Sequence, residues 1–165
     1  MFGQCIIVSI SSANGCQLTA ATRTGLPNAS LRLETWLDEG LRADNGLTLT
    51  DYHLLLLLAE APRHRLRMSE LADRMVFSRS RITYRVSSTT KRGLAVREPD
   101  PDDGRGSRAV LTAAGLETLR RAMPGHAASV RKLFFGSIND DDLACVEGVF
   151  TRLRESLQRN GRKTT

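Results

Sequence analysis

Cysteine is scarce in this 165-residue chain, and its spacing fits no metal site. The three cysteines stand at positions 5, 16 and 145, so they have no metal-ligand spacing and cannot all pair with one another. This usage is typical of a reducing compartment, and we expect a cytoplasmic protein. Long apolar runs are lacking too: the longest is the five leucines of residues 54–58, far below the roughly 18 residues of a membrane span. We therefore expect no bound metal and no membrane partner.

The motifs of common catalytic sites are also lacking. The sequence contains neither a GxSxG nucleophile elbow nor a GxxxxGK(S/T) phosphate loop. Its histidines, His53, His64 and His126, show neither i,i+4 nor HExxH spacing, which favours ordinary packing over metal ligation. We expect a protein that is not an enzyme and holds no cofactor. The alternative, a metal-dependent hydrolase or nuclease, rests only on the acidic turn at residues 100–103.

Acidic residues are the minority in the middle of the chain. Residues 63–108 hold twelve Lys and Arg against six Asp and Glu, and the rest of the chain is balanced, so this segment carries the whole formal charge of +6. Such a basic segment favours contact with a polyanion such as double-stranded DNA. A solvated basic face without a partner is the alternative, and charge alone does not decide between them.

The first part of the chain predicts a leader and two helices. Residues 1–27 are rich in turn-forming residues without a period, so we expect a poorly structured leader. Apolar residues at helical spacing predict a helix over about residues 30–45, which Gly46 ends. Thr50 is the expected N-cap of a buried helix that stops before Pro62.

The central segment predicts two short helices and a hairpin. Ser69 and Ser78 are the expected N-caps of the helices, the second of which runs over about residues 79–92 with Gly93 at its C′ position. After it we expect two weakly alternating strands, at residues 94–98 and 108–111. A turn rich in Pro and Gly, at residues 99–107, joins them. Together these elements predict a winged helix-turn-helix over about residues 48–112.

The last third of the chain predicts a pair of long helices over about residues 113–160. Thr112 and Asn139 are their expected N-caps, and both helices carry apolar residues at spacings of three and four. Such seams favour packing against another helix, within one protomer or across a dimer. The expected fold is mainly α with a small β-wing: a winged helix-turn-helix domain with long N- and C-terminal dimerisation helices.

The helix predicted over residues 79–92 has a polar face without negative charge. On a helical wheel Ile82 and Val86 form the inward stripe, and hydroxyls and cations occupy the opposite side. No Asp or Glu occurs in residues 78–92, whereas a solvated face normally mixes both signs. A helix fits the major groove of DNA, where Arg reads guanine and hydroxyls reach bases or phosphates. We expect this helix to contact DNA.

Four segments resemble MarR-type transcriptional regulators, and the resemblance runs over about residues 33–157. They read LRMSELADRM from position 66, SRSRITYRV from 78, GLAVREPDPDD from 93 and LTAAG from 111. The resemblance implies that residues 28–165 are a single MarR-like domain that binds pseudo-palindromic operators as a homodimer. It further implies a repressor that a small-molecule effector releases from DNA. The sequence departs from the family at Gly104, where a second arginine is usual and Arg108 is the candidate substitute.

The helical wheel and the resemblance together give the expected DNA contacts. By resemblance, Arg105 at the tip of the wing enters the minor groove and Asp103 orients it. The predicted DNA-binding residues are Ser69, Ser78, Arg79, Ser80, Arg81, Thr83, Tyr84, Arg85, Lys91, Arg105 and Arg108.

Three further interpretations stay open. The resemblance implies a site for a small aromatic effector, for which Trp36, Tyr52 and His53 are the candidates, although each is equally compatible with ordinary packing. Cys16 makes a thiol-based redox sensor an alternative, with Arg23 as the nearest cation in sequence. A winged helix that contacts only other proteins is the remaining alternative.

Overall fold

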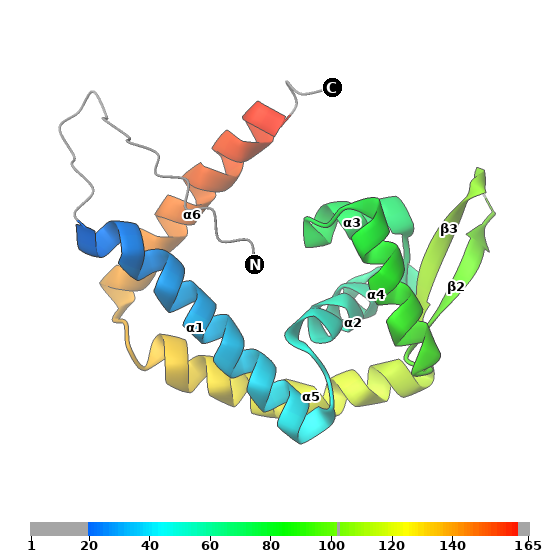
Figure 1. The fold of residues 1–165 in the computed structure, drawn as a ribbon, viewed down its shortest axis with the longest axis horizontal. Helices are drawn as coiled ribbons and strands as arrows, with labels where there is room; N and C mark the ends of the chain where they lie inside the picture. The colour runs from blue at the N-terminus through cyan, green and yellow to red at the C-terminus, as the bar shows by residue number, and fades with distance from the viewer. Residues whose placement is uncertain (1–19, 102, 162–165) are drawn as a thin grey trace. The chain divides into compact units, whose positions relative to one another are not determined.

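The computed structural model of the chain describes residues 20–101 and 103–161. The chain divides into two compact units, Met1–Trp36 and Leu37–Thr165, and the division falls within the first helix. In chain order the elements (Figure 1) are α1 (Ala20–Asn45), α2 (Leu49–Glu60), η1 (Pro62–His64), β1 (Arg65–Arg67), α3 (Met68–Met75), α4 (Arg79–Lys91), β2 (Ala95–Asp100), β3 (Asp103–Leu111), α5 (Ala113–Val130), η2 (Arg131–Phe135) and α6 (Asp140–Gly161).

Helix α1 begins at Ala20, well before the predicted start at about residue 30. Residues 20–27, expected as part of an unstructured leader, are therefore helical. The alanines at its start are strong helix formers, and Pro27 removes one backbone N–H without ending the helix. Residues 1–19 of the predicted leader lie outside the described residues. The predicted end is confirmed, because α1 stops directly before Gly46.

Helix α2 begins earlier than predicted because its N-cap is Thr48 and not Thr50. The Thr48 hydroxyl accepts the Asp51 backbone N–H at 2.9 Å, and the Asp51 carboxylate accepts the Thr48 N–H at 3.2 Å. This reciprocal capping box satisfies two backbone donors at once. Thr50 is followed three residues later by His53, which has no carboxylate to complete such a box.

The small sheet has three antiparallel strands in the order β1, β3, β2. The hairpin of β2 and β3 is longer than predicted, because most of residues 99–107, expected as turn, pair as strand. Pro99 is tolerated there because β2 is an edge strand. Strand β1 was not predicted, because three residues are too few to show an alternation.

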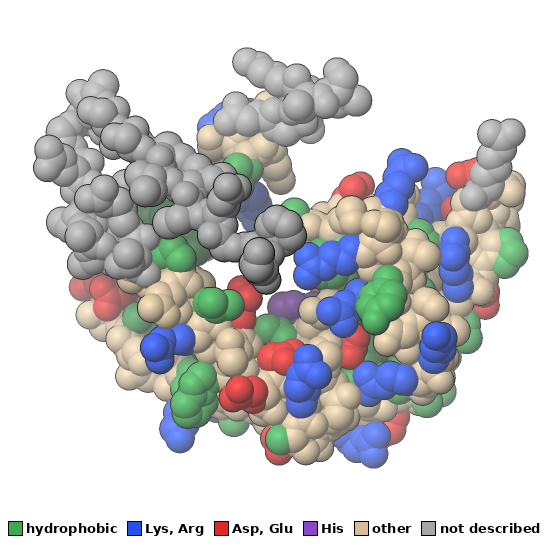
Figure 2. All heavy atoms as spheres, in the orientation of Figure 1, with side chains coloured by type: hydrophobic (Ala, Val, Ile, Leu, Met, Phe, Trp, Pro, Cys, Tyr) green, Lys and Arg blue, Asp and Glu red, His purple; other side chains and the backbone are tan. Residues whose placement is uncertain are grey.

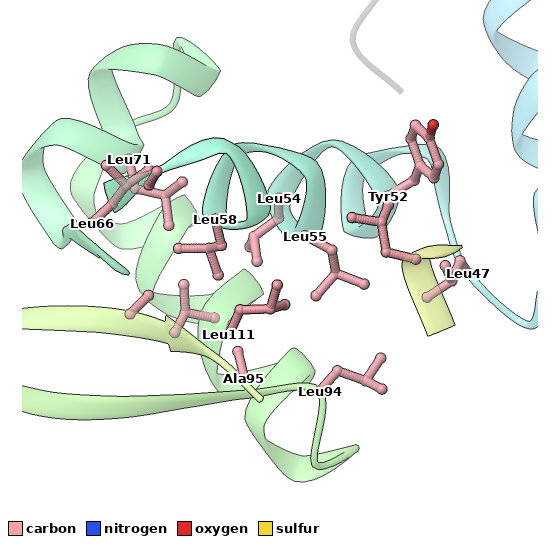
Figure 3. Close-up of a cluster of buried hydrophobic side chains, with 14 of the residues drawn as sticks. Leu47, Tyr52, Leu54, Leu55, Leu58, Leu66, Leu71, Leu94, Ala95 and Leu111 are labelled. Carbon is pink, nitrogen blue, oxygen red and sulfur yellow. The ribbon is translucent and has the colours of Figure 1, made fainter. Parts of the chain in front are cut away.

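Helix α2 lies in the hydrophobic core of the winged region. Its Leu54, Leu55 and Leu58 are fully buried. Figure 3 shows them facing buried side chains from β1, α3 and the hairpin region, among them Leu66, Leu71, Leu94, Ala95 and Leu111. Each buried leucine stabilises the fold by about 1.5–3 kcal/mol, so the run of leucines explains why the winged region forms around α2.

The two predicted caps of the C-terminal helices are confirmed. The Thr112 hydroxyl accepts the Gly115 N–H at 3.0 Å at the start of α5, and the Asn139 side chain accepts the Asp142 N–H at 2.9 Å at the start of α6. Helix α5 packs against α2, continues through Pro124 and passes into the π-helical turn η2. Among the described helices, none has the length and apolar character needed to cross a membrane.

Candidate DNA-binding surface

Helices α3 and α4 pack against each other as the predicted helix-turn-helix. In the turn between them Val76 adopts a left-handed conformation, with φ of +54°. The predicted N-cap of α4 is confirmed, because the Ser78 hydroxyl accepts the Arg81 N–H at 3.3 Å. Gly93 has φ of +71°, the conformation that favours glycine after a helix end, as predicted.

The start of α3 differs from the prediction. Strand β1 runs directly into this helix, so Arg67 occupies the N-cap position and makes no side-chain capping bond. Ser69 therefore lies within the first turn of α3, where it is exposed. Its hydroxyl remains a predicted DNA contact, but it is not a helix cap.

Helix α4 buries one side and exposes the other, as the helical wheel predicts. Ile82 and Val86 are buried in the core. Tyr84 is 69% exposed, which is unusual for a large aromatic side chain. Figure 2 shows Lys and Arg side chains gathered over α3, α4 and the hairpin. Of the contacts predicted on α4 and its cap, Arg85 is half-buried and the others are exposed: Ser78, Arg79, Ser80, Arg81, Thr83, Tyr84 and Lys91.

Several of these exposed groups already have partners near the start of α4. The Arg81 guanidinium carbon lies 3.8 Å from the centroid of the Phe77 ring, a cation–π geometry. The hydroxyls of Ser78 and Ser80 are 3.1 Å apart and hydrogen bonded. The Thr83 hydroxyl donates to the carbonyl of the preceding turn at 2.8 Å, so it is less available to a base than its exposure suggests.

A buried carboxylate joins the three strands at the end of β2 that leads into the turn of the wing. Asp100 is only 4% exposed, and it accepts from Arg67 Nε at 2.8 Å and from Arg108 Nη2 at 2.7 Å. These three residues belong to β2, β1 and β3. The sequence analysis placed Asp100 in a turn. It is instead a buried residue at the end of β2, where two arginines compensate its charge.

This ion pair changes the interpretation of Arg108. Its side chain is 19% exposed and is held at Asp100. Arg108 is therefore held by an ion pair between two strands of the sheet, and its predicted DNA contact in place of an arginine at Gly104 stays a prediction. Arg105 lies within β3, but its side chain is outside the part of the structure that is described, so its DNA contact stays a prediction.

Arg92 joins the end of α4 to the start of α2. Arg92, the C-cap residue of α4, donates to Asp51 Oδ2 at 3.1 Å and to the Gly46 carbonyl at 2.8 Å. Asp51 is buried, and its carboxylate thus serves both the capping box of α2 and this ion pair. Sequence reasoning missed the contact because 41 residues separate the partners.

The junction of α1 and α2 carries another anchored carboxylate. Asp38 accepts the Leu49 N–H at 2.7 Å and is ion paired with Arg42 one turn along α1. Burial by itself would raise the pKa of Asp38, but the hydrogen bonds from Arg42 and Leu49 outweigh that effect and hold the pKa below its usual value. The start of α2 is therefore tied to α1 by a charged group.

The three predicted effector contacts differ in environment. Trp36 and His53 are exposed, whereas Tyr52 is buried. The Tyr52 ring centroid lies 4.4 Å from that of His126 on α5 and 6.2 Å from that of His53. Burial raises the pKa of the Tyr52 hydroxyl and lowers the pKa of the His126 imidazole.

His126 is a residue that sequence reasoning assigned only to packing. Its Nδ1 is buried and has no hydrogen-bond partner among the described residues. A cavity of about 10 Å³ lies beside it between α1 and α5, with room for about one water molecule. The only sequence signal was its place in the apolar seam of α5, where a polar ring is unexpected.

Cys16 lies outside the described residues, and Cys145 is exposed on α6. Within residues 20–101 and 103–161, no three His, Cys, Asp or Glu side chains are grouped so that they could hold a metal ion.

This chain is similar to a protein whose structure was solved in complex with DNA. A MarR family transcriptional regulator from Streptomyces coelicolor, Sco3205, whose crystal structure was determined in complex with DNA, is 37% identical to this chain. The two superpose with a TM-score of 0.80, and the alignment covers 86% of this chain and 91% of Sco3205.

Sequence comparisons also match this chain to transcriptional regulators. A profile of the MarR family matches residues 45–106, which include α2, α3, α4 and β2. The uncharacterised HTH-type transcriptional regulator YkoM of Bacillus subtilis (strain 168) is 29% identical over 99 residues, 59% of this chain and 62% of YkoM. The HTH-type transcriptional repressor YetL of the same organism is 31% identical over 88 residues, 53% of each chain. The match thus spans little more than half the length of these two relatives.

Proposed function

The chain belongs to the MarR family of transcriptional regulators, and on that premise we propose that it binds double-stranded DNA sequence-specifically as a homodimer. In this proposal α4 lies in the major groove and reads base edges, and the wing carries Arg105 to the adjacent minor groove. Such a regulator works in the cytoplasm, where it meets the DNA, and it is not an enzyme.

The observation that carries this proposal is the exposed face of α4. Its hydroxyls and cations form a surface without carboxylates, next to further basic side chains of α3 and the hairpin. Phosphates attract such a surface, and its arginines and hydroxyls match the acceptors that bases present in the major groove. The crystal structure of Sco3205 with DNA supports the same use of this fold.

The apolar seam of α6 supports the homodimer. Phe150, Leu153 and Leu157 are 55%, 47% and 62% exposed, and they recur at the spacing of a coiled-coil seam. Large apolar side chains exposed in one row favour burial against a second apolar surface. A two-fold dimer would present two copies of α4 to the two halves of a pseudo-palindromic operator.

We further propose that the regulator is a repressor released by a small aromatic effector. The name of the relative YetL as a transcriptional repressor supports the first part. Tyr52, His53 and Trp36 remain the proposed effector contacts, and the packing of Tyr52 on His126 supplies aromatic surface for such a ligand. Release would require the effector to bind the free dimer more tightly than the DNA-bound dimer.

The test is selection of DNA by the purified full chain from fragments of its own genome, followed by footprinting of the retained fragments. We expect enrichment of one class of fragment, with protection on both sides of a dyad. Equal retention of all fragments, or none at low salt, would refute sequence-specific binding and favour a winged helix that contacts only proteins. Cleavage of the fragments on addition of Mg²⁺ would instead favour a nuclease.

A further inference from the structure

We propose that Phe77 is a positioning residue for sequence readout, because its ring holds the Arg81 guanidinium ready for a base edge in the major groove. This inference rests on the proposed function. Phe77 stands at the end of the turn between α3 and α4 and is packed against the hydrophobic core, so the ring is anchored. The guanidinium carbon of Arg81 lies 3.8 Å from its centroid.

The local electrostatics explain why this arginine stacks on a ring. Arg81 lies in the first turn of α4, where the helix dipole disfavours a cation. Residues 78–92 contain no Asp or Glu, so no acid of α4 or its caps can pair with it. The negative face of an aromatic ring supplies the attraction instead.

Stacking leaves the recognition atoms of Arg81 available. A guanidinium group stacks through its flat face, whereas its N–H donors point outward in the plane and can hydrogen bond to guanine O6 and N7. The Arg81 backbone N–H is held as well, by the Ser78 hydroxyl. Backbone and guanidinium are thus both positioned before DNA binds.

Such positioning affects discrimination more than general affinity. An exposed arginine loses rotamer freedom when it binds, and the stack with Phe77 removes part of that freedom in the free protein. The benefit appears only where Arg81 meets its matching base. On unrelated DNA the charge of Arg81 still contributes, with or without the ring.

The experiment measures binding of the full chain to two duplexes, one selected by the wild-type protein from random sequences and one of scrambled sequence. Phe77→Leu should lower the ratio of the two affinities about two- to fivefold for each half-site and leave the salt dependence unchanged. Phe77→Tyr keeps the ring and should keep the ratio. In an Arg81→Ala background, Phe77→Leu should have no further effect on the ratio.

Two results would overturn the role of Phe77. If Phe77→Leu lowers the ratio equally in the Arg81→Ala background, Phe77 acts through the fold and not through Arg81. If it raises affinity for the selected duplex, the ring withholds Arg81 from DNA. Circular dichroism and thermal unfolding of each variant show whether the fold is kept. A wild-type chain that prefers neither duplex refutes the proposed function and this inference together, whereas a preference that Arg81→Ala leaves unchanged refutes the inference alone.

Discussion

Helices α4 and α6 each expose one face, and the two faces have opposite chemistry. The exposed side of α4 carries hydroxyls and cations, whereas the seam of α6 exposes Phe150, Leu153 and Leu157. A cationic polar face stays solvated until a polyanion displaces its counterions. An apolar seam loses contact with water only against another apolar surface. The comparison indicates two different partners, DNA for α4 and a second copy of the chain for α6.

The largest expected effect is on the apolar seam. Phe150→Glu places a charge in the middle of the proposed dimer contact. Loss of a central aromatic contact costs about 2 kcal/mol, twice in a symmetric dimer, so the dimer dissociation constant should rise about a thousandfold. Sedimentation equilibrium measures it. Ala144→Glu, which adds the same charge to α6 about 120° around the helix from Phe150, is the matched control and should leave the dimer intact. Equal association of both variants would contradict the role of the seam.

The next largest effect concerns DNA binding by the polar face of α4. Arg81→Ala should weaken binding to the selected duplex by about 1–3 kcal/mol per half-site, and binding to a scrambled duplex much less, because only a base contact distinguishes sequences. Fluorescence anisotropy titrations on both duplexes give the two numbers. Arg120→Ala removes the same charge from an exposed site on α5 and serves as the control. An Arg81→Ala protein that binds both duplexes like the parent would show that Arg81 makes no base contact.

A third change tests how firmly α4 is held. Asp51→Ala removes the carboxylate half of the capping box of α2 and leaves Arg92 without its carboxylate, so we expect a loss of about 2 kcal/mol in the free energy of unfolding. Glu70→Ala breaks the ion pair with Arg74 on the surface of α3 and should change stability by about 0.3–0.5 kcal/mol. Urea unfolding compares the two variants. Similar losses would show that the Asp51–Arg92 contact adds nothing beyond a surface pair.

A substitution in the wing should affect DNA binding differently from a substitution in α4. Arg105→Ala should weaken binding to selected and scrambled duplexes about evenly, because a minor-groove or phosphate contact carries little sequence information. The slope of log K against log salt should become shallower by roughly one per lost phosphate contact. Titrations at several salt concentrations measure both effects. A loss confined to the selected duplex would assign base readout to the wing.

The smallest effect is a pH dependence at His126. Burial, and then the charge of His53, lower the pKa of His126 in the folded state, so the unfolded chain binds more protons near pH 6. Stability should therefore fall as pH drops through about 6.5, the unfolded value. Tyr52 faces the ring from α2, and Asp44 of α1 lines the adjoining cavity. Urea unfolding between pH 5 and 7.5 measures the slope.

A paired comparison isolates that histidine. His126→Phe keeps an aromatic ring against Tyr52 and should flatten the pH dependence. His64→Asn removes an exposed histidine, and asparagine tolerates its positive φ of +55°. This control should keep the wild-type slope. If the two variants give the same slope, His126 does not account for the pH dependence.

Local signals allowed much of the winged region to be predicted from sequence. The caps at Ser78, Thr112 and Asn139 and the left-handed Gly93 depend on neighbours within a few residues, and each is present. The α4 face was predictable for the same reason, since a helical wheel needs only one helix.

The features that the sequence did not reveal depend on distant partners or on close competitors. The ion pairs of Arg108 and Arg92 were not predicted, because their acidic partners, Asp100 and Asp51, come close only when the sheet and the helices pack. Strand β1 likewise exists because β3 pairs with it. Thr48 and Thr50 stand two residues apart, and both are possible N-caps of α2. Thr48 is the N-cap because the Asp51 carboxylate completes its capping box.

The most direct test of the two-partner account is the mass of the protein–DNA complex. The full chain is mixed with the selected duplex, and in parallel with its scrambled counterpart at the same salt concentration, and both samples are examined by sedimentation velocity. The account predicts a complex of two chains per selected duplex and a far smaller fraction bound to the scrambled one. Equal complexes on both duplexes, or a single chain bound per selected duplex, would contradict it.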